Sequence, residues 1–190
     1  MNEPSIRPAG PDDARPIAQV RVDSWRTTYK GMIPDAYLAA MRVDDSAALW
    51  LRVLSATSSK ASVFVADDGG DIVGFAAGNL LAEPRHGLDA ELTAIYLRRD
   101  SQRAGIGRRL VAAVVAAQRA LGATGMLTWV IAGNRGARAF YETLGAELLV
   151  EQPFQWDGME LVEAGYGWRD LDALLAALDG QVTEHSGEKA

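Results

Sequence analysis

A glycine loop at residues 102–107, Gln-Arg-Ala-Gly-Ile-Gly, constrains this chain more than any other segment, because of what lies on either side of it. Residues 91–97 before the loop read as a strand, and residues 108–117 after it read as a helix with one apolar face. The N-terminus of a helix offers free N–H groups and a partial positive charge, and glycine lets an anion come close to the backbone. The pattern predicts a diphosphate-binding turn, with an ordinary surface turn as the alternative.

Two better-known phosphate motifs do not fit this loop. The dinucleotide fingerprint requires a third glycine where the chain has Leu110, and a P-loop requires Gly-Lys-Ser/Thr. The loop nevertheless carries local positive charge, because Arg103, Arg108 and Arg109 lie on or beside it in a chain of formal charge −6.

A second motif follows downstream. Residues 134–146 read as a helix capped by Asn134 and closed by Gly145, and they follow an expected strand at 126–131. With Q-x-x-G-x-G upstream and N-x-x-A-x-x-F-Y here, the chain resembles the GNAT superfamily of acyl-coenzyme A-dependent N-acetyltransferases. The resemblance runs in order from about residue 5 to about residue 170. It departs from the family at Arg99, where proline is frequent, and at residues 103–104, where an Arg/Gly pairing is commoner.

The resemblance implies an α/β (α+β) fold with a mixed, mostly antiparallel central sheet flanked by helices. We expect an N-acetyltransferase domain at residues 4–170, a C-terminal helix at 171–179 and a disordered tail at 180–190. Asp68-Gly69-Gly70 and Trp156-Asp157-Gly158 are typical hairpin turns.

Composition excludes several classes of protein. The chain has 190 residues, 48% hydrophobic and 23% charged, which is typical of one globular domain. A net charge of −6 argues against general nucleic-acid binding. With no cysteine and two histidines, a metal centre or a cysteine nucleophile is not expected. No apolar run approaches the ~18 residues of a membrane span, so we expect a cytoplasmic protein, and we leave open a homodimer.

The resemblance implies acetyl-CoA as the acyl donor, held by the glycine loop, by the backbone of the preceding strand and by the second motif. The residues so implied are Ile95, Tyr96, Leu97, Gln102, Arg103, Ala104, Gly105, Ile106, Gly107, Arg108, Asn134 and Tyr141. In this motif the tyrosine points at the sulfur of coenzyme A. A phenol with a pKa of about 10 stays protonated at neutral pH and can donate to a leaving thiolate, so Tyr141 is the candidate acid. Packing in the core is the alternative.

An alkylammonium must lose a proton before it attacks, so the reaction needs a base or a proton path. Glu91 is the candidate base: it is a carboxylate at the start of an otherwise apolar strand, and the resemblance implies a glutamate at this place that acts as base, commonly through water. Strand periodicity predicts that Glu91 shares a face with Ile95 and Leu97, opposite Tyr96. A solvated glutamate at the strand edge is the alternative, and His86 is a second candidate base.

The sequence says less about which residues bind the acceptor. Trp25 and Tyr29 are four residues apart on one helix face and could line an acceptor pocket, although such a pair also suits a core. We expect direct attack by a primary amine, with a small molecule favoured over a protein. The alternatives are a non-catalytic acyl-CoA sensor and a protein N-terminal or lysine acetyltransferase.

Overall fold

The structure is a computed structural model that describes residues 3–56 and 60–185. Its elements, in chain order, are β1 (Ser5–Pro8), η1 (Pro11–Asp13), α1 (Ala14–Thr28), α2 (Asp35–Ala40), α3 (Val43–Ser55), β2 (Ala61–Asp68), β3 (Asp71–Arg85), β4 (Leu88–Leu97), η2 (Arg99–Ser101), α4 (Ile106–Ala120), β5 (Met126–Ile131), α5 (Arg135–Thr143), β6 (Glu147–Trp156), β7 (Met159–Trp168) and α6 (Leu171–His185). Within the described residues, no helix is both long enough and apolar enough to cross a membrane.

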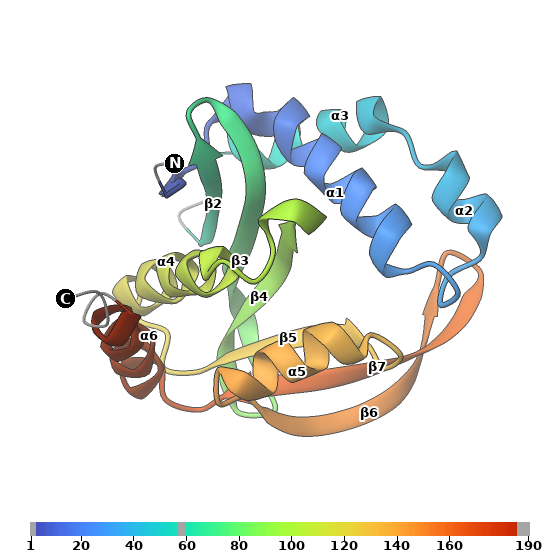
Figure 1. Cartoon of the computed structure of the whole chain (residues 1–190). Coiled ribbons are helices and arrows are strands. Elements are labelled where there is room, and N and C mark those ends of the chain that lie inside the picture. The colour runs from blue at the N-terminus through green and yellow to red at the C-terminus, as the bar shows by residue number, and fades with distance from the viewer. Residues whose placement is uncertain (1–2, 57–59, 186–190) are drawn as a thin grey trace.

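One seven-stranded sheet organises the molecule, in the order β1-β2-β3-β4-β5-β7-β6. Every neighbouring pair is antiparallel except β4 and β5, which run parallel. A parallel pair needs a crossover, and α4 supplies it. Helices lie on both sides of the strands (Figure 1). The mixed, mostly antiparallel sheet flanked by helices that the sequence predicted is therefore confirmed.

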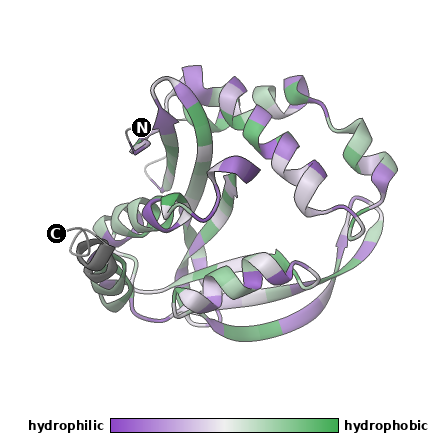
Figure 2. Ribbon diagram, viewed as in Figure 1, coloured by the Kyte–Doolittle hydropathy of each residue, from purple (hydrophilic) through white to green (hydrophobic). Residues whose placement is uncertain are grey.

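Alternation along β3 divides the core into two layers. Phe75 and Ala77 pack with residues of α1 and α3, whereas Ala76 between them packs with residues of α4. Gly78 continues the α4 side, where a Cβ would lie 2.5 Å from a methyl of Val114, so only glycine lets α4 approach this closely. Figure 2 shows that β3 and α4 are rich in hydrophobic residues and that the η2 segment leading toward the glycine loop is hydrophilic.

A β-bulge in β4 breaks the alternation that the sequence predicted for this strand. Ala77 of β3 pairs with Ala94 of β4, and the next β3 residue, Gly78, pairs with Leu92, so Thr93 has no partner in the register. Leu92 therefore packs on the same side as Ile95 and Leu97. Glu91 consequently lies on the face of Tyr96, so its predicted face was wrong. A bulge adds one residue to a strand and reverses which side every following residue occupies.

The start of β4 and the end of the C-terminal helix also differ from expectation. β3 runs on to Arg85 and β4 begins at Leu88, so His86 lies in a tight hairpin turn with φ 52°. α6 begins where expected but continues past residue 179 to His185. The rest of the expected tail, residues 186–190, lies outside the described residues.

The start of the chain is fixed by an ion-pair network, and it generates a pH prediction. The Asp13 carboxylate accepts two 2.8 Å hydrogen bonds from Arg7 and one from the N–H of Gly10. The Arg7 guanidinium, helped by the Gly10 N–H, lowers the pKa of Asp13 below its ordinary value. An acid with a lowered pKa stabilises the fold at neutral pH, and this contribution is lost as the pH falls through its folded-state pKa.

We expect Asp13→Asn to lower the free energy of unfolding by about 1–3 kcal/mol at pH 7, because Arg7 loses its charged partner. The difference from wild type should begin to narrow below about pH 4, where Asp13 protonates in the unfolded state, and it should be lost once the pH falls below the lowered pKa of Asp13 in the folded state. Urea titrations of both proteins at several pH values measure this difference in the free energy of unfolding. Asp44→Asn is the control, since the Arg15–Asp44 pair is exposed on both sides and should matter little. A gap independent of pH would contradict the electrostatic origin.

Candidate active site

The site begins where two strands separate. β4 and β5 pair only at Ala90 with Met126 and at Glu91 with Leu127. Just beyond, the hydroxyl of Thr128 donates to the carbonyl of Leu92 at 2.9 Å. After this link the two strands diverge, as Figure 1 shows. The β4 edge that faces β5 therefore has no strand partner over residues 93–97, among the residues described.

The gap between these strands is a cleft of about 480 Å³. Its lining comes from α1, β4, the glycine loop, β5 and α5: Ser24, Thr28, Tyr29, Leu92, Thr93, Ala94, Ile95, Tyr96, Leu97, Gln102, Arg103, Gly105, Gly107, Arg108, Thr128, Trp129, Val130, Asn134, Gly136, Ala137, Phe140 and Tyr141. No aspartate or glutamate is among these lining residues, although the chain as a whole carries a charge of −6. The cleft is therefore suited to an anionic ligand.

The glycine loop has the geometry of an anion cradle. Gly105 is the N-cap of α4 and has φ 78°, a left-handed conformation that side chains rarely adopt. A Cβ built on Gly105 would meet no atom within 4 Å, so the space above it is open. The first N–H groups of α4 follow directly after Gly105 and have no partners within the helix. These groups fit a diphosphate, because backbone donors and the helix dipole both favour negative charge.

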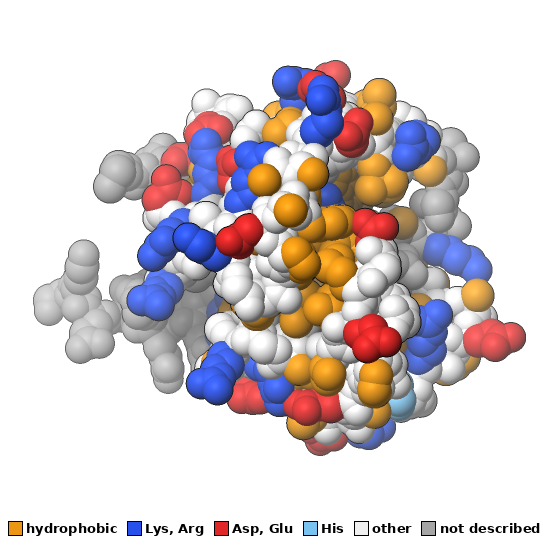
Figure 3. All heavy atoms as spheres, turned by 90° about the vertical axis from the view of Figure 1, so that its right-hand side faces the viewer, with side chains coloured by type: hydrophobic (Ala, Val, Ile, Leu, Met, Phe, Trp, Pro, Cys, Tyr) orange, Lys and Arg blue, Asp and Glu red, His pale blue; other side chains and the backbone are white. Residues whose placement is uncertain are grey.

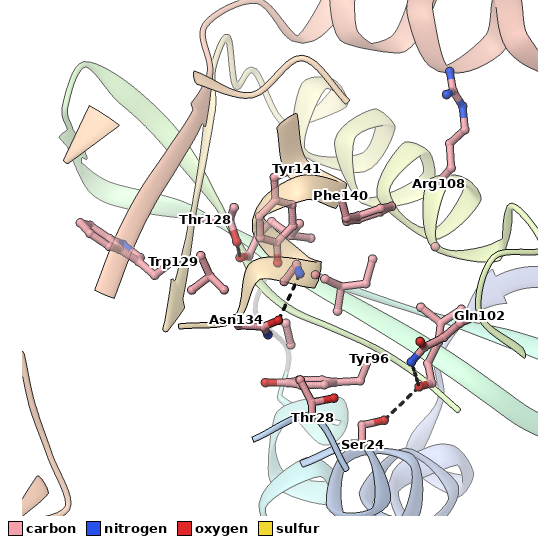
Figure 4. Close-up of a pocket in the computed structure, with 18 of the residues that line it drawn as sticks. Ser24, Thr28, Tyr96, Gln102, Arg108, Thr128, Trp129, Asn134, Phe140 and Tyr141 are labelled. Carbon is pink, nitrogen blue, oxygen red and sulfur yellow. Dashed lines mark hydrogen bonds between the residues drawn. The ribbon is translucent and has the colours of Figure 1, made fainter. Parts of the chain in front are cut away.

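The fold separates the three arginines that the sequence places together. Arg108 turns its guanidinium away from the cleft, as Figure 4 shows, and donates to the carbonyls of Ala177 and Leu178 in α6. Arg109 pairs with Glu3 at 2.8 Å. Only the Arg103 guanidinium remains at the loop. The expectation that all three side chains add charge there was wrong, because the turn of the helix directs Arg108 and Arg109 to other surfaces.

Arg103 is held in an unusual backbone conformation. Its φ of 64° lies in the left-handed region, which costs a non-glycine residue about 1–2 kcal/mol. Among the described residues, its guanidinium has no hydrogen-bond or ion-pair partner. A strained, unpaired arginine beside a helix N-terminus is consistent with a role in binding an anion.

The other loop and strand residues occupy different positions. Gln102 reaches back to the carbonyl of Leu97 at 3.3 Å, and Ser24 of α1 donates to the same carbonyl at 3.1 Å (Figure 4). Ala104 is exposed and does not line the cleft. The Ile106 side chain is buried in the core, so only its N–H is available to a ligand.

Asn134 and Tyr141 are presented by α5. The side chain of Asn134 accepts a 3.1 Å hydrogen bond from the N–H of Ala137, which confirms its predicted capping role. Tyr141 lines the cleft while only 5% exposed, so it is both a core residue and a site residue. Burial raises the pKa of Tyr141 to about 12, although contact with Thr128 opposes the shift. Its phenol therefore stays protonated at neutral pH.

Glu91 lies beside the cleft rather than in its lining. Its side chain is 19% exposed, and one carboxylate oxygen is 4.0 Å from the Arg85 guanidinium. Burial raises the pKa of Glu91, and the nearby charge of Glu163 adds to the effect, whereas Arg85 lowers it. A carboxylate with a raised pKa accepts protons more readily near neutral pH, which suits a general base.

Of the three residues expected to bind the acceptor, Tyr29 lines the cleft, whereas Trp25 and His86 lie outside its lining. Tyr29 lines the cleft and is buried, which raises the pKa of its phenol. Trp25 stacks edge-on against Tyr29 at 4.8 Å but belongs to a core cluster and not to the lining. His86 lies outside the lining in its hairpin turn, where its ring is 5.9 Å from that of Trp129.

Several lining residues escaped the sequence analysis, notably Ser24, Thr28, Thr128 and Trp129. Ser24 and Thr28 are four residues apart on one helix face, and Thr128 interrupts an apolar strand. Both patterns could have marked these residues as candidates from the sequence. The described residues include no group of three or more His, Cys, Asp or Glu side chains that could hold a metal ion.

Comparisons with known proteins agree with this geometry. The model of the "Acetyltransferase (GNAT) family" matches residues 22–146. The chain is 38% identical over 176 residues to "Uncharacterized N-acetyltransferase YuaI" of Bacillus subtilis, covering 92% of this chain and 98% of that protein. It is 33% identical over 144 residues to "Probable N-acetyltransferase Rv2775" of Mycobacterium tuberculosis, covering 72% of this chain and 76% of that protein.

The fold matches solved structures as well. PaiA N-acetyltransferase from Thermoplasma acidophilum, solved in complex with coenzyme A, superposes with a TM-score of 0.69 at 21% identity. The match covers 86% of this chain and 98% of that protein. With the sequence family and the sheet geometry in agreement, the chain belongs to the GNAT family and is an acyl-CoA-dependent N-acetyltransferase.

Proposed function

We propose that this protein transfers an acetyl group from acetyl-CoA to the primary amine of a small molecule, by direct attack within a ternary complex. One observation carries the proposal: a cleft without lining carboxylates runs between β4 and β5, and its lining includes both the N-terminus of α4 and the buried Tyr141. An anionic donor fits the first of these, and a protonated phenol is available at the second.

The donor would bind through its diphosphate and its pantetheine arm. The diphosphate would take the N–H groups that follow Gly105, with Arg103 adding a full positive charge. The pantetheine amides would pair with the free edge of β4 over residues 95–97, as an added strand does. The Asn134 side chain lies on the opposite wall of the cleft and would contact the arm. The similar protein from Thermoplasma acidophilum was solved in complex with coenzyme A, which supports coenzyme A as the kind of ligand that this fold binds.

The chemistry follows from the groups at the centre of the cleft. The neutral amine attacks the thioester carbonyl, the carbon–sulfur bond breaks, and the amide forms. The acceptor's proton passes to Glu91 through water, and Tyr141 gives its proton to the leaving thiolate. A backbone N–H of β4 would stabilise the oxyanion. The chain contains no cysteine that could carry the acetyl group, so a single displacement is the simplest path.

Aromatic contacts around the acceptor side favour a small molecule over a protein. Trp156, at the tip of the β6–β7 hairpin, contacts Trp25 of α1 at 5.2 Å and Tyr37 of α2 at 5.0 Å. These ring contacts join the β6–β7 hairpin to α1 and α2. An extended peptide would need an open groove between these segments. Figure 3 looks onto this side, where hydrophobic side chains gather in a hollow with charged side chains around it.

A cytoplasmic location and a homodimer remain predictions.

An amine panel tests the proposed function. We expect release of free thiol from acetyl-CoA with at least one small primary amine and little release with peptides bearing a free N-terminus or lysine. The assay has no background from the enzyme, because the chain has no cysteine. Binding of acetyl-CoA without turnover across the panel would instead indicate a sensor, and turnover with peptides alone would indicate a protein acetyltransferase.

The cradle is tested by Gly105→Ala. The substitution strains a left-handed position and places a methyl group where we put the diphosphate, so the Kd for coenzyme A should rise by tenfold or more, roughly 1.4 kcal/mol. Gly122→Ala is the matched control: Gly122 lies at the other end of α4, has φ 98°, and also has open space around it. Calorimetry should show equal loss of stability in both variants but loss of affinity only in the first. Equal affinities would contradict the cradle.

The acid is tested by Tyr141→Phe. We expect kcat to fall by about 10²-fold, the typical contribution of a general acid, with the Kd for coenzyme A nearly unchanged. Because the pKa of Tyr141 is raised to about 12, wild-type kcat should show no alkaline decline from this group below about pH 10. Steady-state kinetics across pH measure both. Wild-type turnover in the variant would remove Tyr141 from the mechanism.

A further inference from the structure

Tyr141 is supported from behind by a second tyrosine. The ring of Tyr166 lies 6.1 Å from that of Tyr141, and Trp168 meets Tyr141 edge-on at 5.9 Å. Both supporting rings come from β7, and Tyr166 is fully buried. Packed interiors transmit small displacements, so the place of the Tyr141 hydroxyl depends on where the Tyr166 ring is held.

Tyr166 is in turn held by two residues of the helix that carries Tyr141. Its hydroxyl donates to the Glu142 carboxylate at 2.6 Å and accepts from Nε of Arg138 at 2.9 Å. Arg138 and Glu142 are four residues apart on α5, so they present one charged face to β7. Hydrogen bonds to charged groups are short and strong, which makes this a stiff connection between helix and sheet.

Arg138 extends the connection to two further segments. Its Nη1 donates to the carbonyl of Ala132 at 3.1 Å, in the turn that leads to Asn134. Its Nη2 lies 2.7 Å from Glu151 of β6. One guanidinium thus ties α5 to the turn before it, to β7 and to β6. A lysine could not make these contacts together, because it lacks the planar fork of donors.

We infer that Arg138 and Tyr166 are positioning residues for Tyr141, and that their hydrogen bonds fix its hydroxyl at the leaving thiolate during acetyl transfer. The inference rests on the proposed role of Tyr141 as the acid. Neither Arg138 nor Tyr166 lines the cleft, so neither touches the substrates. Their effect on the reaction should therefore depend on the presence of the Tyr141 hydroxyl.

A double-mutant cycle tests this dependence. Tyr166→Phe removes one hydroxyl and keeps the ring, and we expect kcat to fall roughly threefold to tenfold with the KM for acetyl-CoA unchanged, because misplacement of a reacting group is costly. In the Tyr141→Phe background, the same substitution should change kcat by less than about 1.5-fold. Its effect on melting temperature should be the same in both backgrounds, because that effect reports the lost hydrogen bonds to Glu142 and Arg138 and does not depend on the Tyr141 hydroxyl.

Arg138→Leu should lower kcat as Tyr166→Phe does. Arg138→Lys should restore little of the lost kcat. Arg169→Leu is the matched control, since Arg169 also pairs with a β6 glutamate, Glu147 at 3.2 Å, whereas the hydrogen bonds of the Tyr166 hydroxyl among the described residues go to Arg138 and Glu142. We expect near wild-type kcat in that variant.

The outcomes separate two failures. If Tyr141→Phe slows turnover but Tyr166→Phe lowers kcat equally in both backgrounds, or in neither, the positioning role is wrong and the acid role stands. If Tyr141→Phe leaves turnover unchanged, the acid role is wrong, and the positioning role is overturned with it.

Discussion

The incomplete pairing of β4 with β5 is the constraint on which the rest of the structure depends. Parallel strands normally continue their ladder, but here the bulge at Thr93 changes the course of β4 immediately after the two paired positions. The hydroxyl of Thr128 takes the carbonyl of Leu92 as the strands part. Backbone groups that a neighbouring strand would satisfy are left for a ligand. A defect in the sheet thus creates the binding edge.

The charge distribution follows from this arrangement. An acidic protein would repel a donor that carries several phosphates, yet no carboxylate lines the cleft, and the N-terminus of α4 faces it. Glu91 is kept just outside, half-buried and paired loosely with Arg85. The nearest negative charge on β4 thus lies outside the lining of the cleft. The arginines that could have crowded the loop are instead used to attach α6 and the start of the chain.

Sequence reasoning succeeded where the signal was local. The glycine loop, the capped helix beginning after Asn134 and the two hairpins each depend on residues close together in the chain, and all are present. It failed on the face of Glu91, because a bulge leaves no clear trace in composition and reverses the alternation beyond it. It also failed on Arg108, because the partners that draw this side chain away lie about 70 positions later in the chain.

The sequence by itself determined the family, the order of the elements and the glycine turn that begins α4 at Gly105, since these rest on short-range patterns of glycine, caps and hydrophobic period. Only the tertiary structure decided which side chains face the cleft, that Tyr166 and Arg138 stand behind Tyr141, and that Trp156 closes against α1 and α2. Those contacts join segments far apart in the chain, and their geometry is fixed by how the sheet twists and how the helices pack upon it.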